Sequence, residues 1–226
     1  MHLESVQIGV PDVAVAAVAY ELLLDTRPEA LPGDAVRFSL ERGAVVLEPG
    51  DGGLRSMRFV VDAPVTGLSP EVFNGIAVTL ETETALPRAV PAGGNVEAID
   101  HVVVQSDDPE RAIALWRDRM GIRLALDRVF ADRGMRLVFF RSGGITLEYA
   151  TPHPAAAEPR SRDRFYGLSY RVHDLAAHRD RLLAAGVDVS SVRVGIRPGT
   201  SVVSVRSGTA GVPTLLLQLD PIAASA

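Results

Sequence analysis

Hydrophobic and polar positions recur in the same order along the chain, and this order predicts the fold. Three stretches begin with a short alternating run typical of a strand, pass through an acidic turn and continue with helical spacing; they are residues 6–24, 102–121 and 168–187. Asp12, Asp108 and Asp174 stand at the turns, where a carboxylate accepts hydrogen bonds from the first amides of a helix. Each stretch therefore predicts one strand followed by one helix.

Further strand-like runs follow each helix. They read "IRLALDRVFA", "MRLVFFRSG" and "GITLEYA" after the second helix, and "VDVSSVRV", "TSVVSVRSG" and "VPTLLLQLD" after the third, with turn signals between them. Each unit is thus a βαβββ module. The first module closes with "GAVVLEPG", and a shorter, degenerate copy without a clear helix follows it.

The modules predict an α+β protein of two domains. Four modules, one of them degenerate, pair as an N-terminal domain over residues 1–90 and a C-terminal domain over residues 97–222. The segment 86–95, "LPRAVPAGGN", is rich in Pro and Gly and is interpreted as the linker.

Composition then restricts the chemistry. The chain has no cysteine, and all 23 basic residues are arginine, so neither a thiolate nor a lysine amine is available as a nucleophile. Metal coordination is left to His, Asp, Glu and neutral oxygens. The net charge of −5 argues against nucleic acid and anionic membranes as partners, and no apolar run is long enough to cross a bilayer. Without a secretory signal, we expect a soluble, cytoplasmic protein that binds a small molecule.

The opening and closing segments of the third module, "DHVVVQSDDPERAIALWRDRMGI" and "GITLEYA", resemble the vicinal oxygen chelate superfamily of glyoxalases, bleomycin-resistance proteins and extradiol dioxygenases. The resemblance implies paired modules that form cup-shaped mixed sheets. It also implies a divalent metal ion, such as Zn, Mn, Ni or Fe, held by a His or Gln from a module's first strand and a Glu from its last. His101 and Glu148 match these positions. Strand alternation independently places His101 and Gln105 on one face of their strand.

The fourth module departs from the family pattern. Gly167 stands where a second His is expected, and Gln218, or Leu217 if the register moves by one, stands where the Glu belongs. Gln218 would be a weak, carbonyl-type third ligand. The incomplete set argues against an extradiol dioxygenase. It leaves two interpretations of His101 and Glu148 open, either a metal site or a hydrogen-bonded pair in a cavity that no longer binds metal.

Several other side chains are candidates for the cup or for the surface. Alternation directs Arg171 into the cup, with Glu148 or an acidic ligand as its partner, and directs Asp100 to the opposite side. Gln105, Arg171, Gln218 and Tyr170 are the predicted substrate-binding residues, and His178 is expected on a solvated helix surface. The arginines at 193, 197 and 206 form either an exposed hairpin edge or a site for a substrate carboxylate or phosphate. In the N-terminal half, Ser5 and Glu48 take the two ligand positions.

These observations support one leading function and one alternative. The leading hypothesis is a glyoxalase-like protein that binds a small organic molecule in the C-terminal cup and acts as a metal-assisted lyase or isomerase, with Glu148 as the catalytic residue or as a metal ligand. The alternative is a protein without enzymatic activity that sequesters an amphipathic or cationic compound, as bleomycin-resistance relatives do. A homodimer is a further expectation, because such modules commonly pair between chains in relatives.

Overall fold

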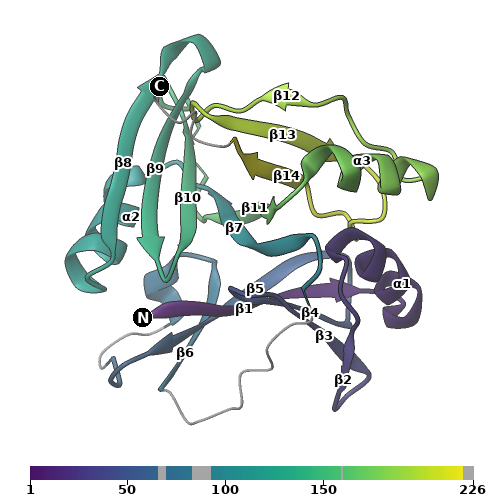
Figure 1. Cartoon of the computed structure of the whole chain (residues 1–226). Helices are drawn as coiled ribbons and strands as arrows, with labels where there is room; N and C mark the ends of the chain where they lie inside the picture. The colour runs from purple at the N-terminus through teal and green to yellow at the C-terminus, as the bar shows by residue number, and fades with distance from the viewer. Residues whose placement is uncertain (66–69, 83–92, 159, 221–226) are drawn as a thin grey trace.

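The structure is a computed structural model that describes residues 1–65, 70–82, 93–158 and 160–220 (Figure 1). Two mixed sheets and a few short helices make up an α+β fold, which confirms the predicted fold class. Most of the predicted linker, 86–95, lies outside the described residues, as do the last two residues of the predicted C-terminal domain. Among the described residues, no helix has both the length and the apolar character needed to span a membrane.

The N-terminal half forms a six-stranded sheet with the strand order β2-β3-β4-β1-β5-β6. Its elements are β1 (His2–Val10), α1 (Val13–Leu24), β2 (Glu29–Leu31), β3 (Ala35–Ser39), β4 (Ala44–Pro49), β5 (Gly53–Val61), the 3-10 turn η1 (Pro70–Phe73) and β6 (Ala77–Thr82). Strand β1 runs parallel to β4 and antiparallel to β5. The elements β5, η1 and β6 correspond to the predicted degenerate module.

The C-terminal half forms an eight-stranded sheet with the order β12-β13-β14-β11-β7-β10-β9-β8. Its elements are β7 (Val96–Gln105), α2 (Pro109–Ile113), the π-helical turn η2 (Ala114–Arg119), β8 (Arg123–Phe130), η3 (Ala131–Arg133), β9 (Met135–Ser142), β10 (Ile145–Pro152), β11 (Arg164–Val172), α3 (Leu175–Ala184), β12 (Arg193–Val194), β13 (Thr200–Val205) and β14 (Thr214–Leu219). The first strands of the two modules, β7 and β11, pair antiparallel at the centre.

The three helices begin where the sequence predicts. Asp12, Asp108 and Asp174 each accept a hydrogen bond from the backbone amide three residues on, at 2.9 to 3.0 Å. The predicted exposure of His178 is wrong, because helix α1 covers this face of α3. His178 is 1% exposed, and its Nε2 lies 2.9 Å from the carbonyl oxygen of Leu23 on α1.

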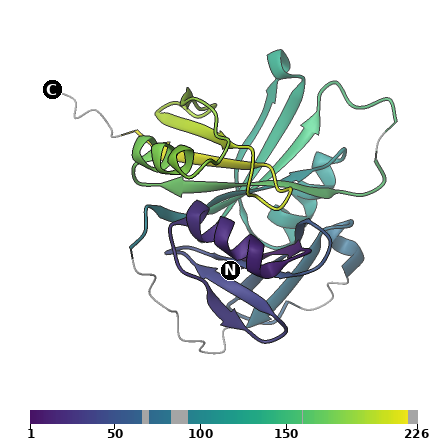
Figure 2. The ribbon, with the colours of Figure 1, turned by 90° about the vertical axis from the view of Figure 1, so that its right-hand side faces the viewer.

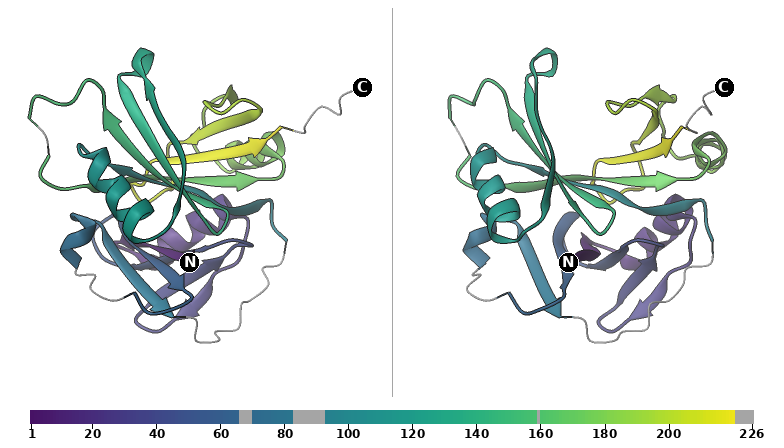
Figure 3. Two further views of the ribbon diagram at one scale, coloured as in Figure 1. Left: turned by 90° about the vertical axis from the view of Figure 1, so that its left-hand side faces the viewer. Right: turned by 60° about the vertical axis from the view of Figure 1, so that its left-hand side comes forward.

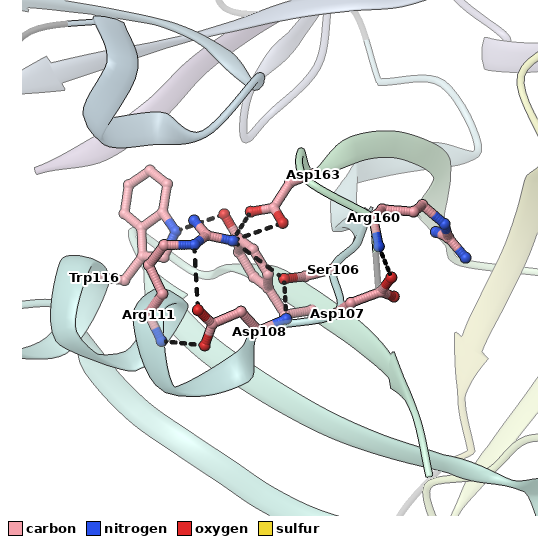
Figure 4. Close-up of polar contacts among 8 residues, drawn as sticks. Ser106, Asp107, Asp108, Arg111, Trp116, Arg160 and Asp163 are labelled. Carbon is pink, nitrogen blue, oxygen red and sulfur yellow. Dashed lines mark hydrogen bonds and ion pairs between the residues drawn. The ribbon is translucent and has the colours of Figure 1, made fainter. Parts of the chain in front are cut away.

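A continuous hydrophobic core joins the two halves of the chain. Trp116 is fully buried in it, and its ring centroid lies 5.8 Å from that of Phe59 and 5.7 Å from that of Phe73, both from the N-terminal half. Its Nε1 donates to Tyr149 Oη at 2.8 Å (Figure 4). Because this one indole contacts residues of both halves of the chain, its packing holds the two halves together.

The connection between β10 and β11 is fastened to the start of α2 (Figure 4). Arg111 Nη2 donates to both carboxylate oxygens of buried Asp163, at 2.7 and 2.8 Å. The backbone amide of Arg160 donates to Asp107. Since the Arg111 guanidinium and the Asp163 carboxylate neutralise each other, this cluster fixes the entry to β11 and carries no free charge toward a ligand.

Each sheet has one side toward the shared core. Helix α1 lies between the N-terminal sheet and the C-terminal half (Figure 2), on the side of Val6 and Phe38. The C-terminal sheet curls, so that β8, β9 and β10 stand up from one side and β12, β13 and β14 from the other (Figure 3). We call the side of the six-stranded sheet opposite α1 the N-terminal outer face; it carries Ser5, Gln7, Arg37, Ser56 and Arg58.

Candidate functional site

One row of side chains crosses the curved sheet, and strand pairing sets its order. Directly paired residues of neighbouring strands have their side chains on the same side of a sheet. The pairs join, in order, Arg123, Arg141, Thr146, His101, Ser169, Leu215 and Ser204. We call the side that carries this row the cup face. Val102 and Val104 are buried on the opposite side, so the His101 side chain faces away from α2, as alternation predicted.

A β-bulge brings Asp100 to the cup face beside His101. Between Ser169 and Tyr170 of β11, the pairing partner on β7 moves by two residues, which leaves Asp100 as the extra residue. Asp100 Oδ2 lies 2.6 Å from His101 Nδ1, and Oδ1 accepts from Arg171 Nε at 2.9 Å and from Arg171 Nη2. The prediction that Asp100 faces away is therefore wrong, because alternation fails at a bulge.

Ion pairs extend from Asp100 to the N-terminal half. Arg171 Nη1 lies 3.8 Å from Glu97 Oε1, which also pairs with Arg42. Burial raises the pKa of Asp100, but the hydrogen bond from His101 and the positive charge of Arg171 outweigh burial and hold this pKa well below its ordinary value. Asp100 is therefore ionised, and it holds the His101 ring through Nδ1.

Glu148 lies on β10, on the same face. It pairs with Val103 of β7 and with Phe139 of β9, whose ring meets His101 edge-on with the centroids 5.5 Å apart. Burial raises the pKa of Glu148; the positive charge of His101 opposes this shift, and the negative charge of Asp100 adds to it. A carboxyl whose pKa is shifted toward neutrality is suited to take up and release a proton.

Gln218 lies on the other side of the sheet from these groups. Arg171 of β11 pairs with Leu217, so Leu217 rather than Gln218 shares its face. Gln218 Oε1 accepts from the backbone amide of Leu175 at 2.7 Å, at the start of α3. The structure therefore corrects the predicted role of Gln218 as a metal ligand and substrate-binding residue. Strand β14 has the alternative register, in which Leu217 takes the place expected for the Glu.

Tyr170 is also turned away from the cup face. It alternates with Ser169 and Arg171, is 0% exposed and lies in the hydrophobic core. Burial raises the pKa of its hydroxyl well above the ordinary value, and nearby Tyr20 raises it further. The predicted contact between Tyr170 and a substrate is corrected, because this side chain contributes packing between the sheet and the core.

Two other predicted substrate-binding residues do lie on the cup face. Arg171 faces the cup, but its partner is Asp100 rather than Glu148 or a ligand. Gln105 lies at the end of β7, four residues beyond His101 and thus roughly 13 Å away. Its Oε1 accepts from Arg164 Nε at 2.7 Å. Both side chains are held by other residues of the chain, Arg171 by Asp100 and Gln105 by Arg164. We therefore keep them as residues that support the site.

The residues present do not fit a three-ligand metal site. A Cβ added at Gly167 would meet the carbonyl oxygen of Pro213 at 2.4 Å, so this position has no room for a His. With Gln218 on the opposite side, the cup face offers His101 and Glu148 as donors, whereas zinc and similar ions usually take three protein ligands. Within the described residues, no group of three or more His, Asp or Glu side chains is placed to hold a metal ion.

The N-terminal sheet has a comparable register. In the C-terminal sheet, Glu148 pairs with Val103, which is two residues after His101. In the N-terminal sheet, the residue two after Ser5 is Gln7, and its partner is Val46. Val46 is therefore the counterpart of Glu148. Glu48 lies two residues farther along β4, so its predicted place at the family's Glu position is wrong. An apolar residue therefore stands at that position.

The cup-face residues that were missing from the predicted site include Arg141, Thr146 and Ser169. Arg141 Nη1 donates to Thr146 Oγ1 at 2.6 Å, and Ser169 pairs with His101. The signal for Arg141 was present in the sequence. The two-residue turn at Gly143–Gly144 requires Arg141 to pair with Thr146, and therefore to share the face of Glu148.

Residues 100–203 match the Glyoxalase/Bleomycin resistance protein/Dioxygenase superfamily. The glyoxalase-type match confirms the resemblance seen in the third module, and it spans His101, Glu148 and Gly167. No curated protein matches the chain.

Solved structures extend the glyoxalase-type fold over the whole chain. A mutant of 4-hydroxymandelate synthase from Streptomyces coelicolor matches with a TM-score of 0.72 and 14% identity, over 100% of this chain and 94% of that one. BphC, a halotolerant catechol dioxygenase, matches with a TM-score of 0.70 and 14% identity, over 96% and 86% of the two chains. Methylmalonyl-CoA epimerase from Mycobacterium tuberculosis matches with a TM-score of 0.51 and 22% identity, over 62% of this chain and 100% of that one. At these identities, the likeness shows the fold alone.

Proposed function

We propose that the chain binds a small organic molecule on the cup face and transfers a proton on it, as an isomerase or lyase of the glyoxalase type does. The observation that supports this most is the placement of two proton-transfer groups on one face: Glu148, whose pKa burial raises, and His101, which the Asp100 carboxylate holds through Nδ1. Because Asp100 holds Nδ1, the second ring nitrogen of His101, Nε2, is the one that can exchange a hydrogen bond or a proton with a ligand.

The proposed step removes a proton from a carbon atom next to a carbonyl group. The Glu148 carboxylate takes the proton, and the electron pair of the broken C–H bond moves onto the carbonyl oxygen. When its Nε2 carries a proton, His101 donates a hydrogen bond to that oxygen and stabilises its negative charge. Return of the proton to the same carbon gives epimerisation or exchange, and departure of a neighbouring leaving group gives elimination.

Deuterium exchange tests this proposal without knowledge of the natural substrate. Wild-type protein is incubated in D₂O with a panel of small ketones, aldehydes and 2-oxo acids, and loss of the C–H signal is followed by proton NMR. We expect exchange on at least one compound, with a loss of about 100-fold or more in Glu148→Gln, the contribution typical of a general base. Arg117→Gln, at an exposed position on η2, is the control and should exchange like the wild type. No exchange on any compound, or equal exchange in Glu148→Gln, would contradict the proposal.

A second function is favoured by the missing ligands of the fourth module. Gly167 has no donor and Gln218 points elsewhere, which suits a protein that binds a compound and leaves it unchanged. The arginines of the cup face favour an anionic compound rather than the cationic one suggested by the overall charge. A ligand that raises the melting temperature but undergoes neither exchange nor turnover would support this sequestering function.

A further inference from the structure

We propose that the ligand carries a carboxylate group and that Arg141 binds it; this inference rests on the proposed function and specifies its substrate class. Within the described residues, Arg141 has one hydrogen-bond partner, Thr146 Oγ1, and no carboxylate within ion-pairing distance. Its side chain is partly buried. A guanidinium that has lost part of its hydration is poorly accommodated without an anion, so the site favours an anionic group.

Three other arginines in this half of the chain already have anions. Arg171 is paired with Asp100, Arg111 with Asp163 and Arg136 with Asp127. Among the described residues, Arg141 is a partly buried arginine of the cup face that has no anionic partner of its own.

Three other guanidinium groups and one carboxylate act on the charge of Arg141. Burial lowers the pKa of its guanidinium; the charges of Arg171, Arg197 and Arg123 add to this effect, while Asp100 opposes it. Arg123 pairs with Arg141 across β8 and β9. Arg123 and Arg197 have no ion pair with a carboxylate in the part of the chain that the structure describes. An anion at Arg141 would therefore relieve repulsion among these guanidinium groups.

A second, independent observation lies on the other side of His101. Ser169 is 4% exposed, and its Oγ has no hydrogen-bond partner among the described residues. It stands in the same row as Arg141, with Thr146 and His101 between them. Because Ser169 lies on the cup face, unlike the Tyr170 hydroxyl in the core, a ligand group there can complete its hydrogen bonding.

The spacing along the row limits the size of the ligand. Arg141 and His101 are separated by one strand, β10, so their backbones lie roughly 10 Å apart. The hydrogen bond to Thr146 holds the guanidinium above that intervening strand. Glu148 is two residues from Thr146 on the same face, or roughly 7 Å along the strand. A carboxylate on Arg141 and an acidic carbon at Glu148 therefore belong to one small molecule, such as a short 2-oxo or 2-substituted acid.

Isothermal titration with paired ligands tests the inference. The panel contains 2-oxo, 2-hydroxy and aromatic carboxylates, each with its primary amide, together with inorganic phosphate. We expect at least one carboxylate to bind the wild type more tightly than its amide does. Arg141→Gln should weaken this binding by about tenfold or more, as expected for loss of a charge-assisted hydrogen bond, and should leave amide binding unchanged. Arg141→Lys should recover part of the loss, because it keeps the charge without the planar fork.

Controls separate the inference from folding effects and from the proposed function. Arg117→Gln should bind carboxylates like the wild type, and circular dichroism with thermal melting should show Arg141→Gln folded. The inference is overturned if carboxylate and amide bind equally, if Arg141→Gln keeps its carboxylate affinity, if phosphate binds more tightly than every carboxylate, or if no carboxylate binds. Deuterium exchange that persists on neutral ketones in any of these cases would leave the proposed function standing and refute the carboxylate alone.

Discussion

The N-terminal outer face and the cup face share a local design and differ in how their polar groups are used. In β1 a register shift between Leu3 and Ser5 leaves Glu4 as an extra residue, just as the shift in β7 leaves Asp100. Glu4 pairs with Arg37 at 2.6 Å, and Asp100 pairs with an arginine as well. An acidic bulge residue anchored by arginine thus precedes the first site position in both modules.

The two faces differ in the residues that follow the bulge. On the N-terminal outer face, Gln7 Nε2 donates to Ser5 Oγ at 2.7 Å, and Ser56 Oγ donates to Gln7 Oε1 at 2.6 Å. These buried groups satisfy one another. On the cup face, Arg141 lacks an anion and Ser169 Oγ lacks a partner in the described residues. Ser5, Gln7 and Ser56 thus pair with one another, whereas Arg141 and Ser169 leave hydrogen-bonding capacity for a ligand.

The largest predicted effect tests whether the two faces belong to one cooperative unit. Trp116→Ala removes a fully buried indole that contacts Phe59, Phe73 and Tyr149, and should lower the free energy of unfolding by about 3–5 kcal/mol. Urea unfolding followed by far-UV circular dichroism should show one transition at lower urea. Two separate transitions, or a cost below about 1 kcal/mol, would contradict a shared core.

Matched substitutions at the bulges should separate the two faces. The Asp100 side chain is 3% exposed and holds both Arg171 and His101, so Asp100→Asn should cost about 2–4 kcal/mol. The Glu4 side chain is 21% exposed and the Arg37 side chain 26%, so Glu4→Gln should cost about 1 kcal/mol or less. Urea midpoints measure both. Equal costs would remove the distinction between the two bulges.

The smallest effect concerns pH and the cost of keeping Glu148 on the cup face. Burial raises the folded-state pKa of Glu148 above its ordinary value of 4.5. As pH rises through the interval between these values, the unfolded chain loses this proton first, so wild-type stability falls there. Glu148→Gln lacks this loss, and its stability relative to the wild type should increase over that interval. A constant difference between pH 4 and pH 7, measured by urea unfolding, would show that burial does not penalise the charge.

The sequence predicts the module order, the helix starts and the direction of His101, because repeats, caps and alternation are local signals. It does not predict Asp100, since one extra residue in a strand is invisible until its partner strand is known. Gln218 was misplaced for a related reason: "TLLLQL" is apolar on both faces, so alternation cannot fix its register. The burial of His178 depends on helix α1, which is distant in sequence. Arg141 could have been found from the hairpin turn beside it.

A crystal structure with the tightest-binding carboxylate tests the central claim most directly, because it shows which of the two faces holds the ligand. We predict the carboxylate on the Arg141 guanidinium, with the rest of the molecule against His101 and Glu148. A ligand bound on the N-terminal outer face at Gln7 and Ser56, or on the cup face without contact to Arg141, would contradict this account.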